Sequence, residues 1–221
     1  MTPELRLDAA GSFPTGNRSG LPYRLDPIAA LALGAVAAPV IAAAGVMIAI
    51  LSKRSPFIAH ERVGAGGKKF WMWKLRTMWP LERPDRTRPR LVEYVCQSGL
   101  PGPKPTRDER VTSRFALFCR KFSIDELPQL FHVVAGQMSL VGPRPITREE
   151  LLEYYGAGAT NVVLSLRPGI TGLWQIEGRS SLSFDERRHL DLCLVHAFSL
   201  RLYLSVLIRT VPRVLRGTDA C

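Results

Sequence analysis

Two adjacent carboxylates, Asp125 and Glu126, stand out in a chain whose basic residues outnumber its acidic residues by 30 to 19. They lie in the run Phe122-Ser-Ile-Asp-Glu-Leu-Pro-Gln-Leu130, beside a predicted helix start. Ser123 and Glu126 have the S-x-x-E spacing of a capping box, in which each side chain satisfies a free backbone N–H of the first turn. The carboxylates could also lie at the positive end of that helix dipole, where phosphate groups bind as well. The dipeptide alone therefore leaves a structural and a catalytic role open.

Arginines recur beside proline or glycine downstream of this pair. The three turns concerned are Gly142-Pro-Arg144-Pro145, Arg167-Pro-Gly-Ile-Thr-Gly172 and Gly178-Arg179. Proline restricts the backbone, and glycine lets it approach a ligand closely. A guanidinium held at a fixed angle matches the oxygens of a phosphate. One arginine in a turn is usually solvated, but three of them downstream of a carboxylate pair predict a phosphate site.

The overall charge of +11 favours an anionic partner, which could be nucleic acid, a membrane surface or a phosphorylated substrate. A length of 221 residues allows one folded domain with an appendage. The four cysteines form no C-x-x-C pair, and the four histidines do not join them at zinc spacing. We therefore expect reduced thiols and a soluble part that faces the cytoplasm.

Residues 27–52 carry no charge and are rich in Ala, Ile, Val and Leu. A straight helix of this length is about 39 Å long, enough to cross a hydrocarbon core of about 30 Å. Pro39 lies in the middle, where it removes a helix hydrogen bond, and basic residues flank both ends, which favours a re-entrant helix–break–helix. Composition alone fits a spanning helix equally well, because proline kinks also occur in spanning helices. A signal peptide fits poorly, since the apolar part is long and starts late.

The remaining pattern predicts an α+β fold that is mostly helical. Residues 57–78 read as a β-hairpin with Gly64-Ala-Gly-Gly67 at its turn. Residues 80–106 form an extended excursion, with a short helix near residues 91–96. Helices are predicted over 111–121, 126–135, 147–155, 183–198 and 200–215, with capping boxes at Thr147-Arg-Glu-Glu150 and Ser183-Phe-Asp-Glu186. The last helix suits a membrane surface and a core-facing position equally well.

Four ordered blocks resemble the bacterial sugar transferase family, the small monotopic phosphoglycosyl transferases. They are Lys74-Leu-Arg-Thr-Met78, Ser123-Ile-Asp-Glu-Leu-Pro-Gln-Leu130, Met138-Ser-Leu-Val-Gly-Pro-Arg-Pro145 and Arg167-Pro-Gly-Ile-Thr-Gly-Leu-Trp-Gln175. The resemblance extends from about Arg24 to the C-terminus. It is greatest to enzymes that start exopolysaccharide synthesis.

The resemblance implies a reaction in which a UDP-sugar, with UDP-galactose or UDP-glucose as first choices, donates its phosphosugar to polyprenyl (undecaprenyl) phosphate. UMP and a polyprenyl diphosphate-sugar are the implied products. Family enzymes form a covalent phosphosugar on the aspartate of an Asp-Glu dyad, which here is Asp125. The resemblance implies that Glu126 supports the dyad through metal or proton handling. Mg²⁺ is the implied cofactor, bound by both carboxylates together with substrate phosphates.

The resemblance also assigns further site residues. Lys74 and Arg144 would neutralise phosphate charge, Asp191 would organise the site or contact the sugar, and Arg167 would face the nucleotide. Arg120 and Pro145 complete the implied substrate-binding set.

The implied organisation is a mobile tail over residues 1–22, a re-entrant membrane segment over 23–52 that breaks at Pro39, and a catalytic domain over 53–221. This domain would lie on the cytoplasmic face of the bacterial inner membrane, in contact with its lipid. A homo-oligomer is compatible with this organisation.

Two positions depart from the family pattern. Gln137 stands where the family usually has an acidic residue, so hydrogen bonding is kept while charge is lost. Ala38 stands where a serine often precedes the proline, and a hydroxyl there could bond a carbonyl freed at the break.

Two other classes of protein remain as alternatives. A membrane-tethered nucleic-acid-binding protein would need clustered basic and aromatic residues on one face, for which Lys69–Arg76 is the candidate. A scaffold that keeps the fold without catalysis is disfavoured by the intact Asp125, Glu126, Lys74 and Arg144. We expect no nucleic-acid partner.

Overall fold

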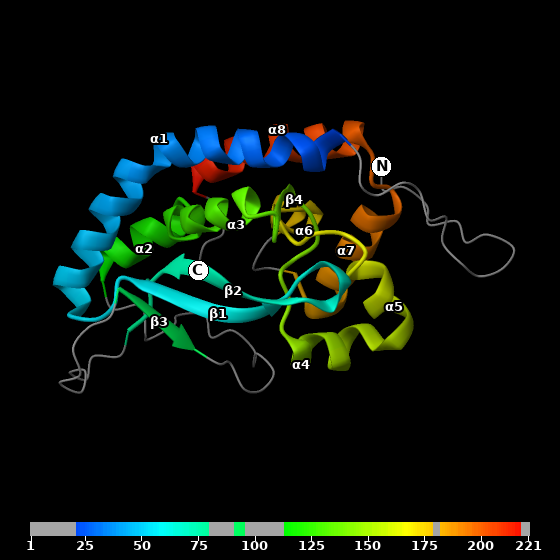
Figure 1. The fold of residues 1–221 in the computed structure, drawn as a ribbon, viewed down its shortest axis with the longest axis horizontal. Coiled ribbons are helices and arrows are strands. Elements are labelled where there is room, and N and C mark those ends of the chain that lie inside the picture. The colour runs from blue at the N-terminus through cyan, green and yellow to red at the C-terminus, as the bar shows by residue number, and fades with distance from the viewer. Residues whose placement is uncertain (1–20, 80–90, 96–112, 179–181, 218–221) are drawn as a thin grey trace, which may run out of the picture.

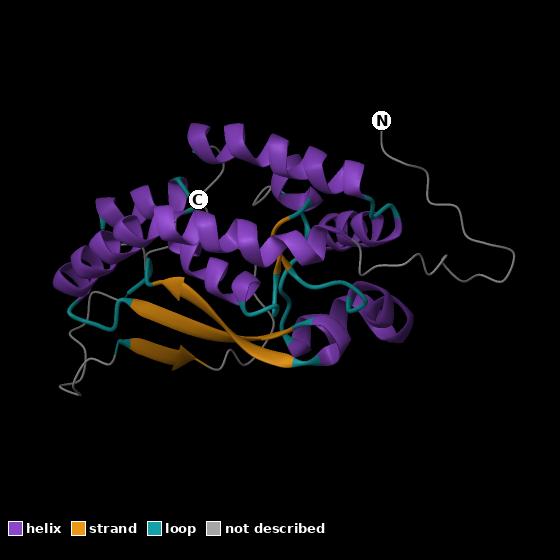
Figure 2. Ribbon diagram, turned by 45° about the horizontal axis from the view of Figure 1, so that its top comes forward, coloured by secondary structure: helices purple, strands orange, loops and turns teal. Residues whose placement is uncertain are grey.

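The computed structural model describes residues 21–79, 91–95, 113–178 and 182–217. Two helices, α1 (Leu21–Ser52) and α8 (Leu200–Arg216), lie side by side along one edge of the molecule (Figure 1). Shorter helices form a layer beneath them, and a small sheet lies beyond that layer (Figure 2). The predicted α+β fold, mostly helical, is confirmed. Most of the tail expected over residues 1–22 lies outside the described residues.

The predicted β-hairpin is confirmed. Strands β1 (Phe57–Val63) and β2 (Lys69–Leu75) pair antiparallel, with Phe57 opposite Leu75 and Val63 opposite Lys69. A 3₁₀ turn over Ala65–Gly67 joins them, and Gly66 and Gly67 take left-handed backbone angles there, with φ of 64° and 78°. Glycine adopts such angles readily because it has no Cβ atom, so the glycines in the sequence mark this turn correctly.

The short helix expected near residues 91–96 is wrong. Strand β3 (Val92–Val95) occupies this place and pairs parallel with β1, Phe57 opposite Val92. Val92, Tyr94 and Val95 are residue types that suit a pleated surface, and β1 offers them an unpaired edge. A single short helix has no comparable source of stability.

The dyad lies on a 3₁₀ helix, η2 (Ile124–Gln129), between α2 (Arg114–Lys121) and α3 (Leu130–Val134). The capping box expected from Ser123 and Glu126 is wrong. Ser123 has a left-handed backbone with φ of 55° and makes no side-chain cap hydrogen bond. The tight left-handed turn at this residue, rather than a cap on an α-helix, sets the direction in which η2 begins.

The other two capping boxes are confirmed. Thr147 and Glu150 cap α4 (Arg148–Glu150), which continues through a wider π-helical turn over Leu151–Tyr155 into α5 (Gly156–Val163). Ser183 and Glu186 cap α7 (Phe184–His196) in the same way. The predicted boundaries hold here because both partners of each cap lie within one turn of the chain.

A second sheet was not predicted. Strands β4 (Ser139–Val141) and β5 (Gly169–Thr171) pair parallel, and α6 (Leu173–Glu177) follows at once. A Cβ atom added to Gly169 would lie 2.0 Å from the Gly142 backbone nitrogen. Only glycine therefore allows the two arginine-bearing loops to come this close.

Helix α1 is continuous, so the expected interruption at Pro39 is replaced by a helix that bends about midway (Figure 1). The segment Pro22–Ser52 is long and apolar enough to cross a membrane by length and composition alone, with a mean hydropathy of 2.3 over its most apolar 18 residues. One face nevertheless packs on the rest of the protein near both ends, through Ala30 on one side of the bend and Ala44 and Ile48 on the other. The opposite face exposes Leu25, Ile28, Leu31, Val46 and Ile50.

Helix α8 combines the two positions that the sequence left open. Tyr203 and Val206 are buried against the core. A stripe along the other face exposes apolar side chains at helical spacing: Leu200, Leu204, Ile208, Val211 and Leu215. The helix is therefore core-facing on one side and apolar toward the outside on the other.

A buried carboxylate ties the two long helices to the second sheet. Asp26, which is 1 % exposed, accepts hydrogen bonds from Ser139 Oγ at 2.5 Å and from the Tyr203 hydroxyl. A buried charge is tolerated when it is hydrogen-bonded in this way. The start of α1 is thus fixed to β4 and α8 at one point.

Candidate active site

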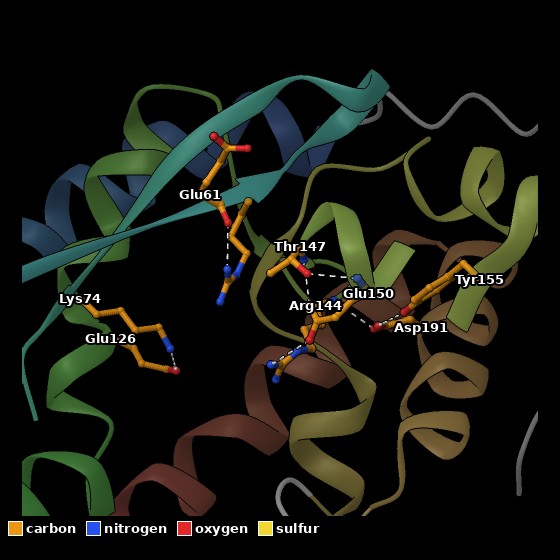
Figure 3. A network of polar contacts seen from close by, with 9 residues as sticks. Glu61, Lys74, Glu126, Arg144, Thr147, Glu150, Tyr155 and Asp191 are labelled. Atoms are coloured by element: carbon orange, nitrogen blue, oxygen red, sulfur yellow. Dashed lines mark hydrogen bonds and ion pairs between the residues drawn. The ribbon is translucent and has the colours of Figure 1, made fainter. Parts of the chain in front are cut away.

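Lys74 and Glu126 form the centre of the site. The Lys74 Nζ atom lies 2.8 Å from Glu126 Oε1, and Figure 3 shows the two side chains pointing toward each other from β2 and η2. Both side chains are about one-third exposed or less, at 27 % and 31 %, so the pair is reachable from outside. Lys74, which the resemblance assigns to the site, thus lies beside the acidic dyad.

Asp125 is electrostatically connected to the same group. Burial and, after it, the neighbouring Glu126 carboxylate raise its pKa to about 6, while Lys74 and Arg120 oppose the rise. Arg120 comes from the last turn of α2, immediately before the left-handed turn. Two carboxylates and two cations therefore share one site, in which a carboxylate oxygen is less strongly stabilised than in water.

His132 fixes the strand that carries Lys74. The Trp73 backbone N–H donates to His132 Nε2 at 3.0 Å, and His132 Nδ1 lies 2.6 Å from Gln137 Oε1. Because Nε2 is the acceptor, Nδ1 carries the proton and donates to Gln137. The expectation that Gln137 keeps a hydrogen bond is confirmed. His132 follows η2 directly in α3, so it links the dyad's own segment to β2.

Arg144 and Asp191 form a second group, which Figure 3 shows apart from the Lys74–Glu126 pair. Asp191 is fully buried; its Oδ1 accepts from the Arg144 backbone N–H at 3.1 Å and its Oδ2 from the Tyr155 hydroxyl at 3.1 Å. Burial raises the pKa of Asp191 to about 7. Of the two roles expected for Asp191, this position suits organising the Arg144 loop, since the side chain has no exposed surface.

Sequence reasoning missed several members of this second group. The guanidinium groups of Arg144 and Arg187 lie over the Trp174 ring, at 5.2 Å and 5.6 Å from its centroid. Glu150, 3 % exposed, lies 4.0 Å from Arg144. Burial is the main cause that lowers the pKa of Arg62 to about 10; Glu150 opposes this shift and Arg144 adds to it. Trp174 lies in a block that the sequence singled out, whereas no local signal marks Arg62 or Arg187.

The two remaining predicted residues occupy different places. Arg167 lies with its guanidinium 5.2 Å from the centroid of the Tyr23 ring, and its backbone N–H donates to the Tyr23 hydroxyl at 3.3 Å. These contacts join the β5 loop to the start of α1 rather than to the dyad. Pro145 is partly exposed and separates Arg144 from Ile146, which forms a β-bridge to Val63.

The dyad fits a magnesium ion that is completed by substrate. Within the described ranges, no group of three or more His, Cys, Asp or Glu side chains is placed to hold a metal. Asp125 and Glu126 can supply two carboxylates, and Mg²⁺ characteristically uses one or two of these together with phosphate oxygens and water. The raised pKa of Asp125 reflects its burial and the adjacent Glu126 carboxylate, and a divalent cation beside the dyad would favour the ionised form.

The basic stretch that could have bound nucleic acid is internally paired. Lys69 lies 2.6 Å from Glu61, and Arg76 lies 2.6 Å from Glu93 and is largely buried. Lys74 is paired with Glu126. Cations engaged in this way are poorly placed to follow a nucleic-acid backbone, so the nucleic-acid alternative is disfavoured.

Comparison with known proteins gives related sequences of described activity. The chain is 40% identical over 171 residues to the UDP-galactose-lipid carrier transferase of Erwinia amylovora, covering 75% of this chain and 34% of that protein. It is 39% identical over 163 residues to the exopolysaccharide production protein ExoY of Rhizobium meliloti, covering 72% and 70%. It is 36% identical over 205 residues to the UDP-glucose:undecaprenyl-phosphate glucose-1-phosphate transferase of Caulobacter vibrioides, covering 89% and 70%.

The chain thus spans about a third of the Erwinia protein and most of the other two. The family model described as bacterial sugar transferase matches residues 21–217, which include both groups of site residues. On this match, the chain belongs to the bacterial sugar transferase family.

Proposed function

We propose that this protein transfers a phosphosugar from a UDP-sugar to polyprenyl phosphate, as the first membrane step of exopolysaccharide synthesis. The proposal is supported by the activities after which two relatives are named, a UDP-galactose-lipid carrier transferase and a UDP-glucose:undecaprenyl-phosphate glucose-1-phosphate transferase, which supply the two substrate classes. They also make galactose and glucose the first donors to test.

The observation that carries the proposal is the arrangement around Asp125. This carboxylate is partly exposed, its pKa is raised, and two cations, Lys74 and Arg120, act on it. An incompletely stabilised carboxylate is a better nucleophile, and cations beside it can balance the charge of a phosphate that approaches. A scaffold without catalysis would gain nothing from the unfavourable energy of this carboxylate.

In the proposed first step, a carboxylate oxygen of Asp125 attacks the sugar-linked phosphorus of the donor. The bond from that phosphorus to the bridging oxygen breaks, and UMP leaves with the bond's electron pair. In the second step, an oxygen of polyprenyl phosphate attacks the same phosphorus, and Asp125 leaves as a carboxylate. Atoms and charge balance in each step, and the products are UMP and polyprenyl diphosphate-sugar.

Lys74 and Glu126 would position the dyad for this exchange. Lys74 can hold the Glu126 carboxylate and present the remaining donors of its ammonium group to a phosphate oxygen. Mg²⁺, when bound by Asp125 and Glu126, would supply charge neutralisation to the diphosphate. Arg144, held by Asp191 and stacked on Trp174, would contact phosphate oxygens from the second group.

We further propose that α1 is re-entrant and lies in one leaflet of the inner membrane, with the catalytic domain on the cytoplasmic face. A helix that packs on the domain near both of its ends is poorly arranged to leave that domain and cross the bilayer. Single cysteines at Arg24 and Lys53, both exposed, test this proposal in a background without the four native cysteines. Both should be labelled from the cytoplasm, whereas labelling from opposite sides would establish a spanning helix.

The activity is tested with purified protein in detergent, Mg²⁺, polyprenyl phosphate and a panel of UDP-sugars. Released UMP is counted, and the covalent phosphosugar is sought by mass spectrometry of the intact protein. The wild type should release UMP with at least one donor, and Asp125→Asn should release none and form no adduct. Near-normal turnover by Asp125→Asn would exclude it as the nucleophile; no release by the wild type with any donor would exclude the proposed reaction.

A further inference from the structure

A cavity of about 440 Å³ lies beneath the middle of α1, between that helix, α8 and the dyad segment. This volume is within the range of roughly 300–1,000 Å³ that is usual for ligand sites. Its wall is mostly apolar and includes Leu33, Val36, Val40, Leu127, Leu140, Ile170 and Leu207.

The cavity exists because of how α1 packs. The start of the helix is fixed through Asp26 and Ala30, and its last third is buried at Ala44 and Ile48. Between these two points Leu33, Val36, Ala37 and Val40 line the cavity, so the helix does not fill the space beneath them. Helix α1 bends about midway along its length (Figure 1), and the cavity residues of α1 lie in this middle part.

One part of the cavity adjoins the catalytic dyad. Ser123 and Glu126 belong to its wall, as does Arg213 from the last turns of α8. The end of α8 lies close to this segment, because a Cβ atom added to Gly217 would lie 2.6 Å from the Lys121 side chain. An apolar cavity with a carboxylate and a guanidinium in its wall suits an amphiphile with an anionic head.

Both helices that cover the cavity expose apolar faces to the outside. The outward residues include Ile28 and Leu31 on α1, and Leu204 and Ile208 on α8. Exposed apolar surface of this extent on neighbouring helices marks contact with lipid rather than with water. A ligand that enters between α1 and α8 therefore comes from the lipid phase.

We propose that this cavity binds the isoprenoid units nearest the phosphate of the acceptor lipid, so that the phosphate emerges beside Glu126 and Arg213. This inference rests on the proposed function and adds the location of the acceptor chain. A single branched chain fits one hollow that reaches the dyad, whereas an ordinary phospholipid has two chains and a diester phosphate that makes a poor nucleophile. The acceptor is thereby held with its reacting group at the rim and its chain under α1.

Filling the cavity tests the proposal. Leu207→Trp places a large side chain in the cavity wall. Ile208→Trp is the matched control, because Ile208 is the next residue of α8 and its side chain, 72 % exposed, points away from the cavity. Leu207→Trp should raise the KM for undecaprenyl phosphate by about tenfold or more, while the KM for the UDP-sugar stays within about twofold. Ile208→Trp should leave both KM values unchanged. Without acceptor lipid, both variants should still release UMP once per protein molecule, as the phosphosugar is transferred to Asp125.

An unchanged lipid KM in a folded Leu207→Trp variant would overturn the cavity assignment while leaving the proposed function intact. Absence of UMP release by the wild type would instead count against the proposed function. The two failures are therefore distinguishable.

Photo-crosslinking gives a test that needs neither turnover nor a variant. Wild-type protein receives a polyprenyl phosphate with a diazirine in the isoprene unit nearest the phosphate, and labelled peptides are identified by mass spectrometry. Label should appear at residues 33–40 and 207–214, and undecaprenyl phosphate should displace it far better than phosphatidylglycerol does. Label confined to Ile28 and Ile208 on the outer faces, or equal displacement by both lipids, would contradict a specific acceptor site.

Discussion

The Nδ1 atom of His132 lies 2.6 Å from Oε1 of Gln137, while the other ring nitrogen accepts the Trp73 backbone N–H at 3.0 Å. The ring is therefore neutral in this arrangement and burial lowers its pKa. Since Trp73 precedes Lys74 in β2, the His132 imidazole fixes the position of this part of the strand relative to the dyad. A proton added at Nε2 would remove the acceptor and release this link.

Gln137→Asp should raise the pKa of His132 by about one unit or more, because a carboxylate at this position favours the imidazolium. Gln137→Ala should lower that pKa, since the amide oxygen at present favours the protonated ring. Imidazole ¹⁵N chemical shifts measured against pH report both values. Identical titrations in the wild type and in Gln137→Asp would show that the two side chains are not in contact.

Lys74→Met should lower kcat/KM by about 10²- to 10³-fold, as expected for loss of a charge that stabilises the transition state. It should also move the acid limb of the pH–rate profile to higher pH, because the Lys74 ammonium lowers the pKa of Asp125. Lys69→Met is the matched control, since Lys69 is an exposed partner of Glu61 on the same strand. A reduced rate with an unshifted acid limb would show that the Lys74 ammonium group does not affect the ionisation of Asp125.

Asp125→Asn should stabilise the folded protein above about pH 6. The folded-state pKa of about 6 lies above the unfolded value of 3.8, so ionisation costs stability at high pH and nothing once both states are protonated. We expect a gain of about 1–2 kcal/mol at pH 8, reduced from the roughly 1.4 kcal/mol per pKa unit because the side chain is partly exposed.

The gain from Asp125→Asn should shrink as the pH falls through about 6 and disappear below about 4. Thermal unfolding at a fixed detergent concentration measures it across this range, with the wild type scanned alongside. A gain that is constant with pH would assign the effect to packing rather than to ionisation.

Asp191→Asn should weaken the hold on the Arg144 loop, because the amide group replaces an acceptor oxygen with a donor that faces existing donors. We expect kcat/KM to fall by about tenfold or more, with the acid limb set by Asp125 unchanged. Tyr155→Phe removes one of the two bonds to Asp191 and should cost about 0.5–1.5 kcal/mol of stability.

Tyr154→Phe is the control for these variants, since its ring stacks on Phe184 and the substitution keeps that stack. Equal losses from Tyr154→Phe and Tyr155→Phe would contradict a specific role for the Tyr155 hydroxyl. A shift of the acid limb in Asp191→Asn would show that the two groups of site residues are electrostatically coupled.

Local signals predicted the fold where both interacting groups lie close in the chain. The caps at Thr147 and Ser183 close within one turn, and the glycines at residues 66 and 67 need angles that few other residues adopt. Strand β3 could not be predicted in this way, because its pairing with β1 depends on an edge more than thirty residues earlier in the chain. Ser123 shows the opposite error, since a correct capping spacing lost to a left-handed turn.

The same distinction holds for the site. The dyad and Lys74 were found from motifs, and their contact joins residues 52 positions apart. Arg62, by contrast, belongs to no motif and reaches the second group only through the pairing of β1 with the loop after β4. The role of Asp26 was equally hidden, because a charge just before an apolar segment resembles an ordinary flank until its partners are known.

The contact between Asp26 and Tyr203 joins positions 177 residues apart, near the two ends of the described chain. Because synthesis runs from the N-terminus, α1 is made well before α8. Asp26 therefore lacks the Tyr203 hydroxyl until nearly all of the intervening domain has been synthesised. The apolar helix α1 must stay unaggregated through this interval, so the order of synthesis sets when the two long helices can be joined.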